Sequence, residues 1–282
     1  MENHYRLLIS CPDSVGIVAA VSQFIADHQG WMLEASYHAD EFSGHFFMRS
    51  EIKAGSLSIS ADEFRYKFQS VADKFSMQWQ LIDASVAKKV VIMASLADHC
   101  LVDLLHRWQS GDLHCQIVAV IANHEKLEKP VKWRDIPFHH VPMHDKAAGN
   151  QKIAELLVHY EADVVVLARY MQIIPPDLCH AYQGRMINIH HSFLPSFIGA
   201  NPYQKAFERG VKLIGATCHY VTESLDEGPI IEQDVARVNH RLSKDDMVRL
   251  GKDVESSVLA RGLRYHLEDR VLVQGNKTVI LN

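Results

Sequence analysis

Two polar side chains, Asn188 and His190, are spaced so that they can act together on one substrate. They lie two residues apart within residues 186–190, which are predicted to form a strand, so both point to the same face. The carboxyl end of a parallel strand is where open α/β sheets bind ligands. An amide and an imidazole there could polarise a carbonyl group and move a proton. On these residues alone, two locally hydrogen-bonded side chains remain the simpler interpretation.

Asp226 is the third candidate. It lies in residues 223–229, where Gly228 and Pro229 predict a tight turn between two strands. A carboxylate presented by such a turn could orient an imidazole, stabilise its charged form, or accept a proton from water. An aspartate in a turn usually bonds only to solvent or to its own backbone. Its combination with Asn188 and His190 is therefore what points to acid–base chemistry.

The remaining histidines do not predict a metal site. His140 and His144 have the i, i+4 spacing of a helical metal pair, but Pro142 between them is poorly tolerated inside a helix. The other pairs are sequence neighbours, which point to opposite faces of a strand. No group of cysteines and histidines has zinc spacing, so we expect no metal.

Two loops bear on ligand binding in opposite ways. Residues 191–202 are rich in Pro, Ser and Gly, which is typical of a binding loop, although the segment could be a plain connector. The turn at residues 95–98 contains no glycine. A backbone cradle for phosphate normally needs glycines at such a turn. The glycine-free turn therefore argues against a nucleotide cofactor or a phosphorylated substrate.

The elements that must position these residues belong to the second of two predicted domains. Residues 1–82 predict a ferredoxin-like βαββαβ pattern, followed by a linker at residues 83–87. Residues 88–282 alternate strands with helices, which predicts an α/β fold with a mostly parallel, Rossmann-like sheet. We expect its strands at residues 90–95, 117–122, 137–141, 163–168, 186–190, 212–221 and 229–238.

The last predicted helix follows Ser243, with Asp246 completing a capping box. Its spacing predicts a buried stripe formed by Met247, Leu250, Val254 and Val258. A terminal hairpin is expected within residues 271–281.

Composition excludes several classes of protein. The chain has 282 residues, of which 48% are hydrophobic, and a net charge of -5, which fits a globular protein and not a disordered or fibrous one. It has no basic tail or stripe, so we expect no nucleic-acid partner. No apolar run reaches the roughly 20 residues that cross a bilayer, so we expect no membrane span. Five widely separated cysteines suggest reduced thiols and a cytoplasmic location.

Several motifs resemble the folate-dependent formyltransferase family. Residues 187–195 (INIHHSFLP), residues 215–220 (GATCHY) and residues 226–231 (DEGPII) are similar to its signature in order and spacing, and the resemblance runs from about Lys88 to the C-terminus. The opening turn and helix, residues 12–16 (PDSVG), resemble the start of an ACT domain. An ACT domain joined to a formyltransferase-type domain is the layout of the deformylase branch of this family.

The resemblance implies hydrolysis of 10-formyltetrahydrofolate to tetrahydrofolate and formate. By matching motif positions, Asn188 would hold the formyl oxygen, and His190 would stabilise the oxyanion or shuttle a proton. Asp226 would position the water and the imidazole, with Thr217 and His219 in supporting positions. Formyl transfer to a small amine, and a folate or amino-acid sensor without turnover, are the alternatives.

Further ligands are implied in the same way. The pterin ring of the folate would lie against Met171, Gln172, Ile173 and Ile174. No cofactor is expected, because the folate is the substrate. Transformylases of this family hold the phosphate of their acceptor with a glycine-rich loop, so the turn at residues 95–98 favours water as the acceptor. An amino-acid effector, glycine or methionine, would bind the ACT domain near Asp13 and Gly16, and a homo-oligomer is expected.

Overall fold

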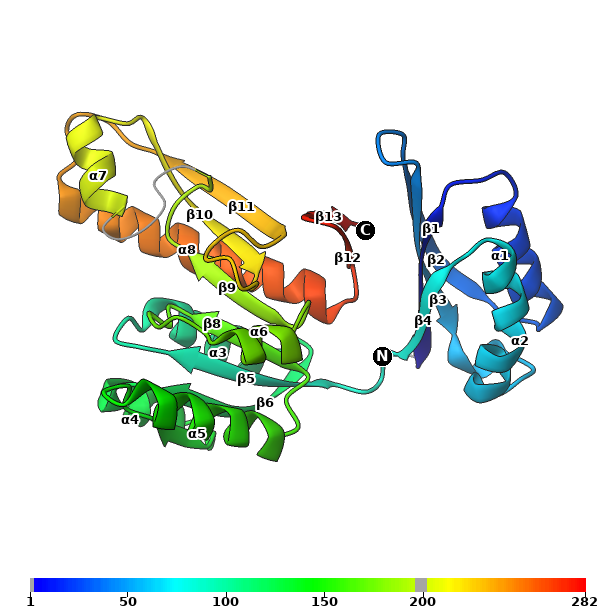
Figure 1. Cartoon of the computed structure of the whole chain (residues 1–282), viewed down its shortest axis with the longest axis horizontal. Helices are drawn as coiled ribbons and strands as arrows, with labels where there is room; N and C mark the ends of the chain where they lie inside the picture. The colour runs from blue at the N-terminus through cyan, green and yellow to red at the C-terminus, as the bar shows by residue number, and fades with distance from the viewer. Residues whose placement is uncertain (1–2, 196–201) are drawn as a thin grey trace. The chain divides into compact units, whose positions relative to one another are not determined.

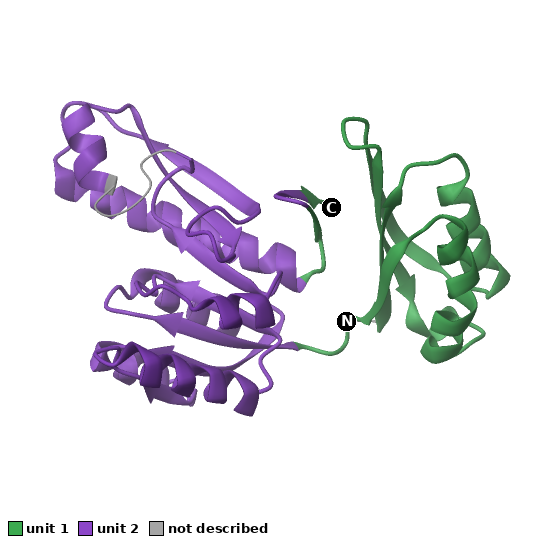
Figure 2. Cartoon of the chain, viewed as in Figure 1, with its two compact units in different colours: residues 1–87, 268–274, 279–282 green, residues 88–267, 275–278 purple. Residues whose placement is uncertain are grey.

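The computed structural model describes residues 3–195 and 202–282, which fold into two compact units (Figures 1 and 2). The first unit comprises Met1–Ala87, Glu268–Gln274 and Val279–Asn282, and the second comprises Lys88–Leu267 and Gly275–Thr278. The end of the chain therefore groups with the N-terminal unit. The predicted division into a regulatory domain at residues 1–82 and a catalytic domain at residues 88–282 stays a prediction about roles.

The first unit is an antiparallel sheet with two helices on one face (Figure 1). Its strands lie in the order β2-β3-β1-β4, with β1 paired to both β3 and β4. The element order confirms the predicted βαββαβ pattern. The elements are β1 (His4–Pro12), α1 (Ile17–Asp27), β2 (Met32–Asp40), β3 (His45–Lys53), the 3-10 turn η1 (Ala54–Ser56), α2 (Ala61–Lys74) and β4 (Gln78–Asp83).

The helices of this unit form because apolar residues recur at helical spacing. In α1, Val21 and Ile25 share the buried face, and in α2, Phe64 and Phe68 do so. These side chains share one hydrophobic core with strand residues such as Leu7 and Ile9. A second, smaller cluster joins Phe47 of β3 to Leu272 and Leu281 near the C-terminus. The terminal hairpin predicted within residues 271–281 is present as β12 (Val271–Gln274) and β13 (Lys277–Ile280).

The second unit contains the predicted, mostly parallel sheet, in the order β11-β10-β9-β8-β5-β6-β7. Strands β9, β8, β5, β6 and β7 run parallel, whereas β10 is antiparallel to both β9 and β11. The strands are β5 (Lys88–Ala94), β6 (Cys115–Ala122), β7 (Phe138–His140), β8 (Val164–Ala168), β9 (Met186–His190), β10 (Leu213–Tyr220) and β11 (Ile230–Arg237).

Helices cover this sheet. Residues of α5 and α6 share a hydrophobic core with strand residues such as Val91 and Val165. The long helix α8 packs against α3 and against β9, β10 and β11. The helical elements are α3 (His99–Gln109), η2 (Glu125–Leu127), α4 (Glu128–Lys132), α5 (Lys146–His159), α6 (Pro176–Ala181), α7 (Pro202–Arg209) and α8 (Lys244–Leu267).

Helix α8 differs from the prediction on its buried face. The capping box is present, because the Asp246 backbone N–H donates to the Ser243 hydroxyl and the Ser243 backbone N–H donates to the Asp246 carboxylate. Leu250 and Val254, however, are only partly buried. Gly251 and Glu255 take their place between Met247 and Val258, so the predicted stripe was wrong at its centre. The helix buries a charged residue that the search for apolar periodicity overlooks.

All five cysteines are free. Within the described part of the chain, no helix is both long enough and apolar enough to cross a membrane.

Candidate active site

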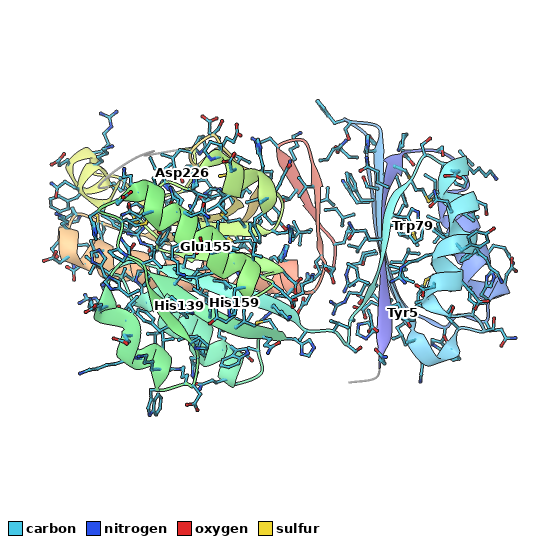
Figure 3. All side chains as sticks on the ribbon, turned by 60° about the horizontal axis from the view of Figure 1, so that its bottom comes forward. Tyr5, Trp79, His139, Glu155, His159 and Asp226 are labelled. Carbon is cyan, nitrogen blue, oxygen red and sulfur yellow. The ribbon has the colours of Figure 1, made fainter. Side chains whose placement is uncertain are left out.

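Asn188, His190 and Asp226 meet at a pocket of about 270 Å³ in the second unit. The pocket lies where β8 and β9 end, as expected for an open α/β sheet. Figure 3 labels Asp226 within this unit. The antiparallel pairing of β9 with β10 places Thr217 opposite His190 and His219 opposite Asn188. The register of two strands therefore brings the predicted motifs together.

His190 is oriented by Asp226. Its Nδ1 atom lies 3.1 Å from Oδ2 of Asp226, and both side chains are largely buried. The Nε2 atom is buried, and no hydrogen-bond partner for it occurs within residues 3–195 and 202–282. Since a carboxylate can only accept, Nδ1 carries a proton and donates it. In a neutral imidazole, Nε2 is then an acceptor that none of the described residues satisfies.

His219 orients the Asn188 amide. The Nδ1 atom of His219 lies 2.9 Å from the backbone oxygen of Tyr220, so this nitrogen is the protonated one. Its Nε2 atom lies 3.2 Å from Nδ2 of Asn188 and 3.6 Å from Oδ1 of Asp226. His219 therefore contacts both the Asn188 amide and the Asp226 carboxylate and fixes the Asn188 side chain at the pocket wall.

The Asp226 carboxylate is held in its ionised form. Burial raises the pKa of Asp226, but hydrogen bonds and charge interactions with His190 and His219 lower it by more, so the pKa lies well below its usual range. The backbone at Asp226 is left-handed, with φ 58°. In the same turn, a Cβ atom at Gly228 would lie 1.9 Å from the backbone oxygen of Tyr220. Only glycine fits there, and the close approach fixes the turn that presents the carboxylate.

Thr217 supports the loop that follows β9. Its hydroxyl donates to the backbone oxygen of Ser192 (2.9 Å) and accepts from the backbone N–H of Leu194 (3.0 Å) and from Nε2 of Gln233 (2.9 Å). Thr217 does not line the pocket. Residues 196–201, the centre of the predicted binding loop, lie outside the described residues.

The four predicted folate-contacting residues, Met171 to Ile174, all line the pocket. Met171 and Ile173 are 57% and 72% exposed, so they form an uncovered apolar rim. The glycine-free turn supports this rim, because the Ser95 hydroxyl accepts a hydrogen bond of 3.1 Å from the backbone N–H of Met171.

The predicted effector residues lie in the first unit. The Asp13 backbone N–H donates to the backbone oxygen of Gly44 (2.8 Å), and both Asp13 and Gly16 are exposed. Gly16 has φ 97° and precedes α1, with no atom within 4 Å of a Cβ placed there. The turn therefore exposes backbone at the start of a helix.

Sequence reasoning missed a buried charged cluster behind the pocket. Glu255 of α8 is 1% exposed, and its carboxylate lies 2.8 Å from Nε2 of His99 and 3.3 Å from Nε of Arg169. It also accepts a hydrogen bond of 2.5 Å from the Tyr203 hydroxyl. Burial raises the pKa of Glu255, but these partners lower it by more and keep the carboxylate charged. Gly251 and Glu255 lie at helical spacing from Met247, but neither is apolar, so the pattern of the sequence gives no signal for their burial.

This cluster also contains the one group of potential metal donors found among the described residues. Atoms of His99, Cys100 and Glu255 lie within 4.8 Å of one another. Arg169 already neutralises the Glu255 carboxylate, and burial strongly raises the pKa of the Cys100 thiol. These features fit an ion-pair cluster better than a metal site. The expected absence of a metal stays a prediction.

The adjacent histidines His139 and His140 do not line the pocket. The His139 ring is hydrogen-bonded to the Tyr160 hydroxyl at 2.7 Å. In Figure 3 it lies beside His159 of α5, away from Asp226. His139 therefore belongs to the packing around α5.

Comparison with known proteins places this chain in a family. The sequence model of the formyl transferase family matches residues 88–263. A formyltetrahydrofolate deformylase from Bacillus subtilis is 50% identical over 100% of this chain and 95% of its own length. The crystal structure of a formyltetrahydrofolate deformylase from Pseudomonas syringae pv. tomato has a TM-score of 0.98 and 59% identity, covering 100% of this chain and 95% of that chain.

The chain belongs to the formyltetrahydrofolate deformylase family. The deformylases match both of its units. A phosphoribosylglycinamide formyltransferase from Anaplasma phagocytophilum matches less, with a TM-score of 0.64 and 26% identity over 69% of this chain and 95% of that chain. The two-unit architecture is thus shared with the deformylases over the full length of this chain.

His191, next to the site, should make the stability of this deformylase-family chain pH-dependent. Burial and then the charge of Arg169 lower the pKa of His191 from 6.5 to about 3. The unfolded chain therefore binds a proton below pH 6.5 that the folded chain does not. The contribution of His191 to the free energy of unfolding should be fully present above pH 6.5. It should fall as the pH drops towards 3, with a slope approaching about 1.4 kcal/mol per pH unit.

Urea denaturation across this pH range checks the expectation. His191→Gln should show a shallower loss of stability than the unmodified protein, because one differential proton is removed. His114→Gln, at an exposed histidine of the same unit, is the control and should keep the original slope. Equal slopes in all three proteins would contradict the assignment to His191.

Proposed function

We propose that this chain hydrolyses 10-formyltetrahydrofolate to tetrahydrofolate and formate. The observation that carries the proposal is the convergence of Asn188, His190 and Asp226 on one pocket with an apolar rim at Met171 to Ile174. The full-length similarity to proteins named formyltetrahydrofolate deformylases supports the choice of substrate. An N-formyl group is an amide-like acyl donor, which suits an amide and an imidazole placed side by side.

Each residue has a part in the proposed reaction. The Asn188 amide donates a hydrogen bond to the formyl oxygen and stabilises the negative charge that develops there. The Nε2 atom of His190 takes a proton as the water oxygen bonds to the formyl carbon, and the Asp226 carboxylate stabilises the resulting imidazolium. The carbon–N10 bond then breaks, N10 takes the proton from the imidazolium, and formic acid leaves and ionises to formate.

The acceptor is water because nothing at the turn after β5 is built to hold a phosphorylated amine. Ser95 uses its hydroxyl to support the backbone at Met171, and no glycine occurs up to Asp98. Backbone cradles for phosphate need glycine at this position. The turn therefore favours hydrolysis over transfer.

Asp226→Asn should abolish most of this activity. The amide cannot stabilise an imidazolium as a carboxylate does, so we expect kcat to fall by roughly 10²–10⁴-fold, the range that general acid–base groups supply. Folate binding should persist, because the apolar rim is unchanged. Formate release from 10-formyltetrahydrofolate without added amine measures the rate, and a folate analogue measures binding by calorimetry.

Asp253→Asn is the matched control, since Asp253 is an exposed carboxylate on α8. It should leave formate release unchanged. If the unmodified protein releases no formate but formylates an added amine, the chain is a transferase. If Asp226→Asn changes neither rate nor binding, the site has no catalytic role and the sensor alternative gains support.

The first unit is proposed to be an ACT regulatory domain that binds glycine or methionine near Asp13 and Gly16. Its sheet order and the exposed backbone at the start of α1 support this assignment. Backbone N–H groups at a helix start attract an anionic group such as a carboxylate.

Titration calorimetry of the full chain with glycine and with methionine tests the effector. We expect heat of binding from at least one of them and a change in formate release, both weakened in Asp13→Asn. Alanine serves as the comparison amino acid. If neither glycine nor methionine produces heat or a rate change, the effector proposal is wrong.

The protein is further proposed to be a cytoplasmic homo-oligomer. Trp31, Leu33 and Tyr37 are exposed on or beside β2, which is an edge strand of the first sheet. Exposed apolar edge strands are sites of pairing with another chain. Five unpaired cysteines agree with a reducing compartment.

Light scattering should therefore give a solution mass that is a multiple of the 32.0 kDa of one chain. Leu33→Lys should shift the mass towards that of one chain, because a charge on the edge opposes pairing. Val273→Lys, at another exposed apolar residue, is the control. A mass of 32.0 kDa for the unmodified protein would contradict the proposal.

A further inference from the structure

Four polar side chains form a buried wall next to the catalytic pocket. We call His99, Arg169, Tyr203 and Glu255 the acceptor wall. The Glu255 carboxylate is its centre, with one oxygen contacting Nε2 of His99 (2.8 Å) and Nε of Arg169 (3.3 Å), and the other bonded to the Tyr203 hydroxyl (2.5 Å). Each residue comes from a different part of the fold: His99 begins α3, Arg169 follows β8, Tyr203 lies in α7 and Glu255 lies in α8.

The wall adjoins the pocket through Arg169 and His191. Arg169 lines both the wall and the pocket, whereas His99, Tyr203 and Glu255 line only the wall. His191 bridges the two, with its ring centroid 5.3 Å from that of His190 and 6.0 Å from that of Tyr203. Side chains of the wall therefore continue from the pocket lining at Arg169 and His191.

The packing of the wall is tight. A Cβ atom at Gly251, one turn before Glu255 on α8, would lie 2.0 Å from the Tyr203 hydroxyl oxygen. The glycine thus makes room for the tyrosine. Even a paired buried carboxylate contributes little net stability, because removing the charges from water costs about as much as their attraction gains, so this cluster needs a reason beyond stability. The proposed hydrolysis makes no use of Glu255, His99 or Tyr203.

The related transferases suggest what the wall excludes. By their name, phosphoribosylglycinamide formyltransferases act on an amine that carries a phosphoribosyl group, and one of them shares the fold of the second unit with a TM-score of 0.64. Such an acceptor must reach the formyl carbon beside the folate, whereas water needs far less room. We propose that the acceptor wall closes the pocket to amines and thereby selects water as the acceptor.

This inference rests on the proposed deformylase reaction and makes a chemical prediction. With the wall opened, an amine nitrogen can attack the formyl carbon in place of water. The carbon–N10 bond breaks, N10 gains the proton that the amine loses, and the products are a formamide and tetrahydrofolate. The reaction is balanced without any further reactant.

Truncation of the wall tests the proposal. Glu255→Ala and His99→Ala remove volume, whereas Glu255→Gln keeps the volume and removes the charge. With 10-formyltetrahydrofolate and either hydroxylamine or glycinamide, the ratio of formylated amine to formate is measured by mass spectrometry. We expect both truncations to raise this ratio by at least about tenfold, the scale on which a small change in pocket size alters discrimination. Glu255→Gln should keep the ratio of the unmodified protein.

The outcomes separate this inference from the proposed function. No formate from the unmodified protein would overturn the deformylase reaction itself. Formate without any rise in formylated amine, in truncated variants that keep their Tm and their folate affinity, would overturn the wall alone. An equal rise in Glu255→Gln would show that charge and not volume controls the acceptor, which also overturns it.

The test remains decisive if one variant does not fold. If Glu255→Ala does not fold because Arg169 is left unpaired, the result of His99→Ala decides. His99 is the first residue of α3 and its side chain is 13% exposed. The unmodified protein is itself informative. If it already formylates hydroxylamine as readily as the truncated variants do, the wall excludes nothing and the proposal is wrong.

Discussion

The contact between the Asp226 carboxylate and Nδ1 of His190 joins two remote segments, a parallel strand and the turn after an antiparallel one. It fixes the direction of the imidazole, and the same carboxylate approaches His219, which in turn holds the Asn188 amide. Three side chains of the pocket therefore take their orientation from one ionised group. The neighbouring backbone serves this arrangement through the left-handed conformation at Asp226 and the close approach at Gly228.

The sheet supplies the constraint that makes this contact possible. Strand β10 runs antiparallel to β9. Thr217 and His219 of β10 pair with His190 and Asn188 of β9, the strand that ends at the pocket. Thr217 anchors the start of the following loop, and His219 faces Asn188. Displacing the register by one residue would turn both side chains to the other face.

Much of this could be predicted from the sequence because it depends on local pattern. The continuous apolar run of β8 and the two-residue spacing of Asn188 and His190 predict a buried strand and a shared face, and both are present. Glu255 could not be predicted in this way. A charged residue on a helix is normally exposed, and its burial depends on His99, Arg169 and Tyr203, which reach it from other elements. Tertiary partners, and not periodicity, decide which face of α8 is buried.

The C-terminal residues matter for anyone who cuts this chain into pieces. Leu272 and Leu281 cover Phe47, and the Arg49 guanidinium donates to the backbone oxygen of Glu268, so the first unit is completed by residues from the far end of the sequence. A fragment that stops at residue 87 would leave an aromatic ring and a guanidinium without their covering. Such a fragment is expected to aggregate more readily than the intact polypeptide, and proteolytic trimming of the tail would have the same effect.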